Sequence, residues 1–387
     1  MKRSTNRILT THVGSLVRPP EVREVLQAKD SGQIDAQQVA TRVRQAIAAV
    51  VKRQADCGID IPSDGEYSKS SFSGYANDRL TGFETRANAH EIFRRGRDRR
   101  AFSEFYQEYD ASQGGSGATG IAAVCTGPIT YVGEAAVRGD IENFTAALSQ
   151  VQVEEAFIPA VAPGTIELQR RNAYYPTAEA YLFAIANAMR HEYKAIVDAG
   201  FILQIDDPRM VTQYDTEEPE PALEDYRTFA ALRVEALNHA LAGLPEDRIR
   251  YHVCWGSWHG PHTTDVPLKD IVDLVLRIRA GAYSVEAANA RHAHEWTVWE
   301  SVKLPEGKML IPGVVSHTTN LVEHPELIAQ RIVQYARLVG RENVIASTDC
   351  GFAQGAFLQR VHPSIMWAKL QALAEGTRLA TKQLWDR

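Results

Sequence analysis

The chain alternates between short apolar runs and longer segments in which apolar residues recur every three or four positions. The short runs are rich in β-branched and aromatic residues and are followed by Gly or polar residues, a pattern typical of buried strands. The longer segments have the periodicity of amphipathic helices, and Gly58 and Gly200 stop two of them. Nine runs are predicted to be strands, at residues 10–16, 58–66, 121–129, 156–166, 201–208, 250–255, 282–288, 309–317 and 343–350.

Predicted helices lie between most of these strands. They are expected at about residues 34–58, 140–155, 178–200, 219–242, 267–279, 293–302, 323–340 and 361–381. Repeated strand–helix order predicts a parallel α/β fold, and about eight such units predict a closed (β/α)8 TIM barrel. Because nine strands are one too many, we predict that 121–129 is an accessory strand. No linker, low-complexity tract or repeat interrupts the chain, so residues 1–387 are expected to form one domain.

One long segment departs from this order. Residues 67–118 are polar and aromatic-rich and lack a clear period, which predicts a long loop insertion after the second strand. Its charged run RRGRDRR, at 94–100, is interpreted as a solvated surface rather than a binding patch.

Composition excludes several classes of function. With 387 residues, 44% of them hydrophobic, the chain can bury a large core, and its net charge of −6 offers no basic footprint for nucleic acid. No apolar run approaches the ~18 residues of a membrane span, and the basic N-terminus lacks the apolar core of a signal peptide. Four cysteines in so long a chain do not make a disulfide framework, so a cytoplasmic location is expected. The expected partners are small molecules, and the oligomeric state is left open.

Metal-binding side chains stand at the ends of three predicted strands. Two cysteines, one histidine and one glutamate make a ligand set suited to Zn²⁺. The four candidates are His252, Cys254, Glu286 and Cys350. Since Zn²⁺ needs only four ligands, the other histidines nearby are interpreted as surface or supporting groups; these are His259, His262, His292 and His294.

Other strands also end in polar side chains, which matters because barrel enzymes gather their chemistry at the C-terminal ends of their strands. These further candidates are Ser15, Glu66, Asp206 and His317. Each also has a structural interpretation. Asp206 could cap a loop, Glu66 could pair with an arginine, and His317 could be an ordinary loop residue.

Taken in order, these motifs resemble the catalytic C-terminal barrel of the cobalamin-independent methionine synthase family. The resemblance spans residues 10–358. It is carried by HVGS at 12–15, DGE at 64–66, QIDDP at 204–208, GVVSH at 313–317 and DCG at 349–351, together with the four metal-ligand positions. In DGE, Asp64 stands where the family has histidine.

The resemblance implies a zinc-dependent thiol alkyltransferase, with methyl transfer to homocysteine as the expected reaction. His252, Cys254, Glu286 and Cys350 would hold Zn²⁺, and His317 would be the proton donor. The thiol substrate would be bound by three residues, Ser15, Glu66 and Asp206. Zinc-bound sulfur is held as thiolate, the reactive form of the nucleophile.

Alternatives stay open at this point. The family's folate-stacking tryptophan has no counterpart in residues 162–172, so the alkyl donor is undetermined. HTTN at 317–320 and VEHPEL at 322–327 are at least as similar to a single-barrel relative, the epoxyalkane:coenzyme M transferase. A zinc hydrolase is less favoured because thiolate ligands lower the Lewis acidity of the metal. A purely structural zinc site is less favoured because its ligands usually cluster at short spacings.

Overall fold

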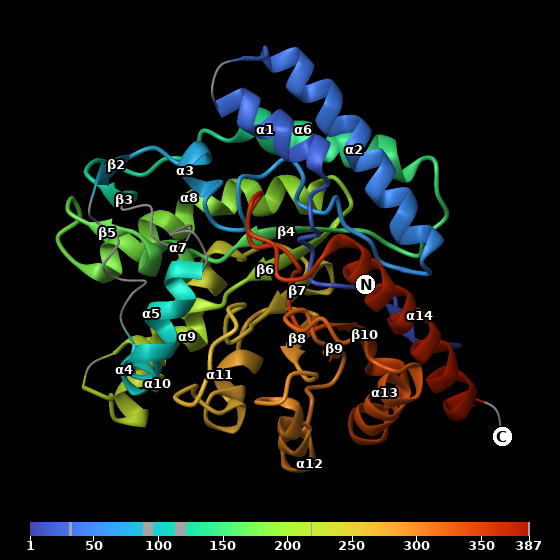
Figure 1. Cartoon of the computed structure of the whole chain (residues 1–387). Coiled ribbons are helices and arrows are strands. Elements are labelled where there is room, and N and C mark those ends of the chain that lie inside the picture. Colours follow the sequence, from blue (N-terminus) through green and yellow to red (C-terminus); the bar gives the residue numbers. More distant parts are fainter. Residues whose placement is uncertain (31–32, 88–95, 113–120, 218, 386–387) are drawn as a thin grey trace.

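The core of the molecule is a curled, fully parallel sheet of seven strands. The computed structural model describes residues 1–30, 33–87, 96–112, 121–217 and 219–385. The strand order is β1-β10-β9-β8-β7-β6-β4. The strands are β1 (Leu9–Thr10), β4 (Phe157–Val161), β6 (Ile202–Asp206), β7 (Ile249–His252), β8 (Ala282–Glu286), β9 (Met309–Val315) and β10 (Ile345–Thr348). The sheet confirms the predicted TIM-type α/β fold (Figure 1).

Residues 59–62 fill the eighth position, between β1 and β4. On one side Ile61 N donates to Thr10 O at 3.0 Å, and on the other Phe157 N donates to Pro62 O at 3.1 Å. Only one isolated parallel bridge, from Thr11 to Ile61, is assigned there. The predicted strand 58–66 therefore lies where it was expected but has fewer backbone hydrogen bonds than its neighbours.

Two apolar clusters hold the barrel together. The smaller one fills the inside of the barrel and draws on seven of its eight positions, with Leu9, Ile61, Phe157, Ile202, Ala282, Met309, Ile311 and Ile345. On β7 the inward residue is Arg250 instead, whose guanidinium stacks 3.4 Å from the centre of the Phe157 ring. The larger cluster lies between the strands and the surrounding helices. The barrel is thus apolar at its base and becomes polar toward the strand ends.

Helices cover the outside of this sheet (Figure 1). They are α1 (Pro20–Asp30), α2 (Ala36–Asp56), α6 (Glu134–Leu148), α7 (Pro163–Gln169), α8 (Ala178–Asp198), α9 (Arg209–Thr216), α10 (Leu223–Ala240), α11 (Val272–Leu276), α12 (Val298–Ser301), α13 (Pro325–Val339) and α14 (Pro363–Trp385). Asp35 and Thr177 cap α2 and α8 through their side chains, which explains where these two begin. Among the helices that the structure describes, none combines the length and apolar composition needed to cross a membrane.

Two short helices, α7 and α9, directly follow strands, and the sequence pattern did not predict them. The apolar run 156–166 was predicted as one strand, but β4 ends at Val161 and Pro163 begins α7. Proline favours the first helical turn, so the strand prediction was wrong beyond 161. In the same way Pro208 precedes α9 directly after β6.

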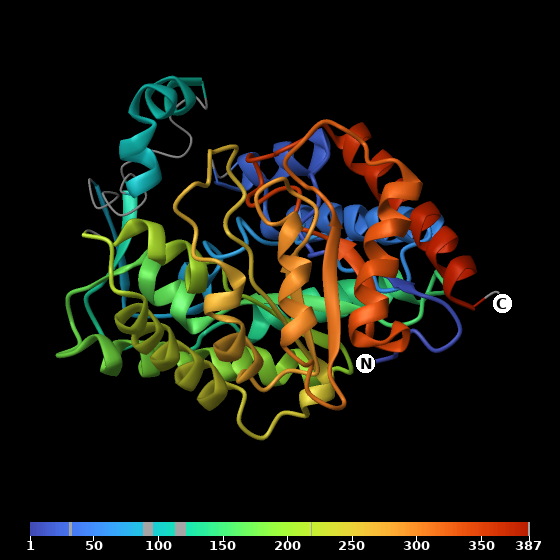
Figure 2. The same ribbon diagram turned by 90° about the horizontal axis from the view of Figure 1, so that it is seen from below.

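The accessory strand and the insertion after the second strand are confirmed, but the described part of 67–118 is not a loop; residues 88–95 and 113–118 lie outside the described residues. β3 (Ile121–Cys125) lies in a separate sheet with β2 (Phe83–Ala87) and β5 (Arg171–Asn172). The described part of the insertion also contains α3 (Ala76–Arg79), α4 (Arg97–Ala101) and α5 (Ser103–Ser112). Figure 2 shows α4 and α5, in teal, standing out from the barrel. These helices are too short to give a readable period.

The charged run at 94–100 is not a solvated surface where the structure describes it. Asp98 is buried, and Arg97 forms an ion pair of 2.6 Å with Glu220. Residues 94 and 95 lie outside the described residues.

Candidate metal and substrate site

Two cysteines and one histidine from separate strand ends converge at the C-terminal end of the barrel. His252 ends β7, Cys254 lies two residues beyond it, and Cys350 lies two residues beyond β10. The ligand atoms of the three lie within 4.8 Å of one another, and all three residues are buried. The Sγ atoms of Cys254 and Cys350 are 3.3 Å apart, and Ser257 Oγ lies 3.3 Å from Cys350 Sγ. The hydrogen bond between the thiols lowers the pKa of Cys350 and raises that of Cys254.

The residues of this cluster fit a zinc ion. His252 is oriented by a contact of 3.2 Å between its Nδ1 and Ser284 Oγ. Its Nε2 is buried and has no hydrogen-bond partner among the described residues. An orphaned imidazole nitrogen beside two cysteine sulfurs is the donor set of a zinc site, and the contact to the other ring nitrogen is the support such histidines usually have.

Glu286 stands next to this cluster at the end of β8 but outside the group of three. Its carboxylate accepts hydrogen bonds from Trp255 N at 3.3 Å and from Asn289 Nδ2 at 2.7 Å. Burial raises the pKa of Glu286 well above its ordinary value. The loop beyond it is fixed by Asp349, whose carboxylate accepts from the backbone of Ala287 at 2.8 Å.

The predicted substrate residues share one cavity with the metal cluster. This cavity has a volume of about 290 Å³. It is lined by Ser15, Glu66, Asp206, His252, Cys254 and Cys350, among others. The structure therefore brings together six of the eight residues that the sequence singled out.

Glu66 and Asp206 enter this cavity as buried carboxylates. Gln204 Nε2 holds Asp206 Oδ1 at 2.7 Å, and Arg250 Nε in turn holds Gln204 Oε1 at 2.7 Å. Glu66 has a φ of 60°, a left-handed conformation that is uncommon outside glycine and that clusters at functional sites. Its Oε2 is buried without a partner among the described residues. Burial raises the pKa of Glu66 to about 8 and that of Asp206 well above its ordinary value.

Close packing against Ser15 explains why residue 351, which follows Cys350 in the DCG motif, is a glycine. A Cβ at this position would lie 2.0 Å from the Oγ of Ser15, so the Ser15 side chain would have to turn away from its place in the cavity. The backbone of the two segments is joined by Phe352 N, which donates to Ser15 O at 2.9 Å. The glycine thus allows Ser15 to approach the metal cluster.

His317 and Glu286 line a second, larger cleft of about 880 Å³. The two spaces adjoin, because Gly256 and Trp258 line both of them. His317 is buried, and neither of its ring nitrogens has a hydrogen-bond partner among the described residues. Burial lowers the pKa of His317 to about 4, so its imidazole is neutral at pH 7.

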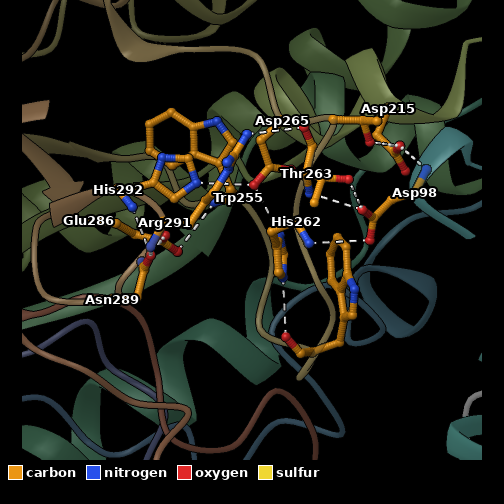
Figure 3. A network of polar contacts seen from close by, with 12 residues as sticks. Asp98, Asp215, Trp255, His262, Thr263, Asp265, Glu286, Asn289, Arg291 and His292 are labelled. Carbon is orange, nitrogen blue, oxygen red and sulfur yellow. Dashed lines mark hydrogen bonds and ion pairs between the residues drawn. The ribbon is translucent and has the colours of Figure 1, made fainter. Parts of the chain in front are cut away.

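A buried polar network supports the loop that carries Cys254 and Trp258, and it ties this loop to the insertion (Figure 3). Asp98 on α4 accepts hydrogen bonds from Thr263 N at 2.9 Å and from Tyr106 OH at 2.8 Å. Tyr106 on α5 accepts from Trp258 Nε1 at 2.9 Å. The insertion is therefore part of the wall of the site.

Two of the histidines interpreted as supporting groups belong to this network. His262 Nδ1 and His292 Nε2 both lie 3.0 Å from Asp265 Oδ2, and His292 stacks on Trp255 at 4.1 Å between ring centres (Figure 3). The carboxylates of Asp265 and Glu295 raise the pKa of His292 to about 10 despite its burial.

Sequence reasoning missed several residues of the site. Three of them lie in loops without periodicity and are recognised only by their tertiary contacts. These are Trp258, which contacts Tyr106, Ser257, which contacts Cys350, and Asn289, which contacts Glu286. Arg209 also lines the smaller cavity, and its position directly after QIDDP was the one signal that could have indicated it.

The chain is similar to proteins of a known family over almost its whole length. The sequence profile described as "Cobalamin-independent synthase, Catalytic domain" matches residues 8–162 and 170–365. The methionine synthase of Saccharolobus islandicus (strain L.S.2.15 / Lassen #1) is 24% identical over 391 residues, covering 97% of this chain and 95% of that protein. The methionine synthase of Saccharolobus solfataricus has the same identity and coverage.

A solved structure shares the fold. It is a B12-independent methionine synthase from Shewanella sp. W3-18-1 in complex with selenomethionine. The two superpose with a TM-score of 0.75 at 17% sequence identity, over 98% of this chain and 99% of the other.

Proposed function

We propose that this chain, which belongs to the cobalamin-independent synthase catalytic-domain family, is a zinc-dependent methyltransferase that methylates the sulfur of homocysteine. One observation carries the proposal: the His252, Cys254 and Cys350 cluster opens into the same small cavity as Glu66 and Asp206. A thiol that also bears an ammonium group fits this combination. We further propose that residues 1–387 act as one zinc-containing domain.

His252, Cys254 and Cys350 would hold the zinc ion, with Glu286 as the fourth ligand. Glu286 would be the weakest of the four ligands for a borderline-soft ion. Zinc, when bound, would supply a thiolate at neutral pH from a thiol whose ordinary pKa is about 8.5. Asn289 Nδ2 and Trp255 N donate hydrogen bonds to the Glu286 carboxylate and so hold it at the end of β8.

Glu66 and Asp206 orient the thiol by accepting hydrogen bonds from its ammonium group, and Ser15 closes the same side of the cavity. Both carboxylates are buried, where a charge-assisted hydrogen bond is stronger than in water. Burial raises the pKa of both carboxyl groups, and a substrate ammonium beside them would favour their ionised forms.

The methyl donor would occupy the larger cleft, where His317 and Glu286 lie. His317 acts as the proton donor to the leaving group. Because its imidazole is neutral at rest, it must first take up a proton, and the substrate thiol gives one up when it ionises. The overall reaction then balances, with the thiol proton ending on the leaving nitrogen or oxygen.

A matrix of thiols and donors tests the proposal on zinc-loaded protein. Homocysteine and coenzyme M would each be offered with methyl-folates, methylcobalamin-type donors and small epoxides, and thioether products detected by mass spectrometry. We expect methionine from homocysteine. Alkylated coenzyme M in its place would overturn the choice of thiol, and hydrolysis of a substrate without any added thiol would overturn thiol transfer itself.

A further inference from the structure

Arg209 is a buried cation in the wall of the small cavity. It begins α9, three residues beyond Asp206, and only 6% of its surface is exposed. Pro208 and Thr212, its neighbours on the same element, line the cavity with it. Burial lowers the pKa of Arg209 only to about 10, so its guanidinium is charged at neutral pH.

The guanidinium of Arg209 lacks the partners that a buried arginine normally has. Within the described residues it makes one hydrogen bond, from Nη2 to Gln213 Oε1, and no ion pair. Its Nε is buried without a partner. Arg250 gives a contrast, because it is also buried but donates to three neutral acceptors, Gln204 at 2.7 Å, Thr11 at 2.9 Å and His12 O at 2.8 Å. Leaving the N–H groups of a buried guanidinium unpaired is costly, so a further acceptor is expected at Arg209, and an anion would be the strongest one.

The carboxylates around Arg209 are already engaged. Glu167 forms an ion pair with Arg233 at 2.9 Å, and Glu217 accepts from Gln213 at 2.6 Å. Asp215 accepts from Asp98 N at 2.9 Å, in the network that anchors the insertion. None of these three carboxylates contacts Arg209 directly, and an anion in the cavity would supply the partner that its guanidinium lacks.

The cavity thus has charges of both signs in its wall. Glu66 and Asp206 are its carboxylates, and Arg209 and Arg360 are its arginines. Arg360 donates to Gln354 Oε1 at 2.7 Å and to Tyr109 OH at 3.3 Å, whereas the buried Nε of Arg209 has no partner among the described residues. An α-amino acid carries an ammonium and a carboxylate a few ångströms apart, and this pair of charges matches the wall.

We propose that Arg209 binds the carboxylate of the thiol substrate and so restricts the site to thiols that are α-amino acids. This rests on the proposed function, since it assigns a residue to the substrate named there. Arg209 is a specificity residue here, and the metal site does not depend on it.

Binding of two thiols to zinc-loaded protein tests this, measured by calorimetry without turnover. Homocysteine is compared with 3-aminopropane-1-thiol, which is the same molecule without its carboxylate. Arg209→Gln should weaken homocysteine binding about tenfold or more, the worth of a charge-assisted bidentate contact, and leave the decarboxylated thiol unchanged. The homocysteine affinity of Arg209→Lys should lie between those of the wild type and Arg209→Gln, because lysine keeps the positive charge but cannot donate two parallel hydrogen bonds to a carboxylate. Arg190→Gln, an exposed site on α8, is the matched control.

Two outcomes would overturn the proposal. Equal weakening of both thiols in Arg209→Gln would mean that the residue only supports the fold. Unchanged thiol binding with a raised KM for the methyl donor would mean that the anion belongs to the donor.

A metal-free measurement separates this proposal from the proposed function. 2-Aminobutyrate, which is homocysteine without its sulfur, should raise the melting temperature of the wild-type protein more than that of Arg209→Gln when compared with sodium chloride at matched ionic strength. If the protein methylates no thiol but shows this difference, the anion site stands and the proposed reaction fails. If 2-aminobutyrate acts equally on both proteins, the anion site fails.

Discussion

The Sγ atoms of Cys254 and Cys350 lie 3.3 Å apart although 96 positions separate them in the sequence. Two strands, β8 and β9, stand between the strands that carry them. Curvature of the sheet is what brings the ends of β7 and β10 together. The cluster therefore forms only when the sheet has curled between β7 and β10.

We expect about one tightly bound zinc ion per chain. Cys254→Ser and Cys350→Ser should each lose most of it, while the circular dichroism spectrum stays that of the wild type, because the apolar core lies below the site. Zinc would be measured by plasma mass spectrometry after dialysis. Cys125→Ser, on the accessory strand β3, is the control and should keep its zinc. A Cys350→Ser protein with full zinc content would contradict the site.

Asp206→Asn should weaken homocysteine binding by roughly tenfold or more, since a charge-assisted hydrogen bond is worth about 1.5–3 kcal/mol. Zinc content should not change, because Asp206 is not one of the proposed ligands. Asp198→Asn, exposed at the end of α8, is the matched control. Normal affinity in Asp206→Asn, measured by calorimetry, would remove this residue from the thiol site.

The raised pKa of Glu66 predicts that the affinity for homocysteine depends on pH. This pKa of about 8 means that the carboxyl is mostly protonated in the empty cavity at pH 7, whereas a bound ammonium favours the ionised form. Homocysteine affinity should therefore rise as pH increases toward 8, and binding should release close to one proton more than it does in Glu66→Gln. Calorimetry in buffers of different ionisation enthalpy counts these protons. Equal proton release from both proteins would show that Glu66 does not meet the ammonium.

His317→Asn should lower kcat by at least about a hundredfold, the usual range for a general acid, with zinc content and thiol affinity near wild type. The loss should depend on the donor. A sulfonium donor, whose leaving group needs no proton, should be far less affected than an amine or epoxide donor. Rates measured with both donor types decide the matter, and an equal loss would assign His317 a positioning role.

The hydrogen bonds of Asp98 are expected to hold the insertion against the barrel. Its carboxylate accepts hydrogen bonds from Tyr106 OH at 2.8 Å, Thr263 N at 2.9 Å and Thr263 Oγ1 at 2.7 Å. Asp98→Ala leaves these buried donors unpaired and should lower the free energy of unfolding in urea by about 2–4 kcal/mol. Asp110→Ala, which removes an exposed ion pair with Arg99, should cost less than about 1 kcal/mol. Similar losses in the two variants would contradict the anchoring role.

The sequence was informative wherever a residue ends a strand. His252, Glu286 and Asp206 are the last residues of β7, β8 and β6, so locating an apolar run also located the side chain beyond it. Parallel strands in a barrel bring such ends together, which is why distant motifs could be assigned to one site.

Other parts of the site had no such signal. Trp258 and Tyr106 meet across 152 positions, and neither lies in a segment with a readable period. The role of Arg209 could not be predicted, because the strand pattern ends at Pro208 and the helix that follows, with eight residues, is too short to show a clear periodicity. The buried state of Asp98 also could not be read locally, since its partners come from the loop after β7. Contacts of this kind depend on tertiary structure and leave no periodic trace.

The sparse pairing of residues 59–62 leaves one side of the barrel with fewer backbone hydrogen bonds than the side formed by β7 to β9. Strands β7, β8 and β9 are joined by parallel ladders, and the β9–β10 ladder has a register shift between Ser347 and Thr348. Glu66 follows residues 59–62, which one isolated bridge, Thr11 to Ile61, joins to the segment that leads to Ser15. Substitutions around Ser15 and Glu66 should therefore be absorbed by local backbone shifts more readily than substitutions at the ends of β7 and β8. Under the proposed function, a barrel built in this way could acquire new thiol substrates while the residues proposed to bind the metal stay in place.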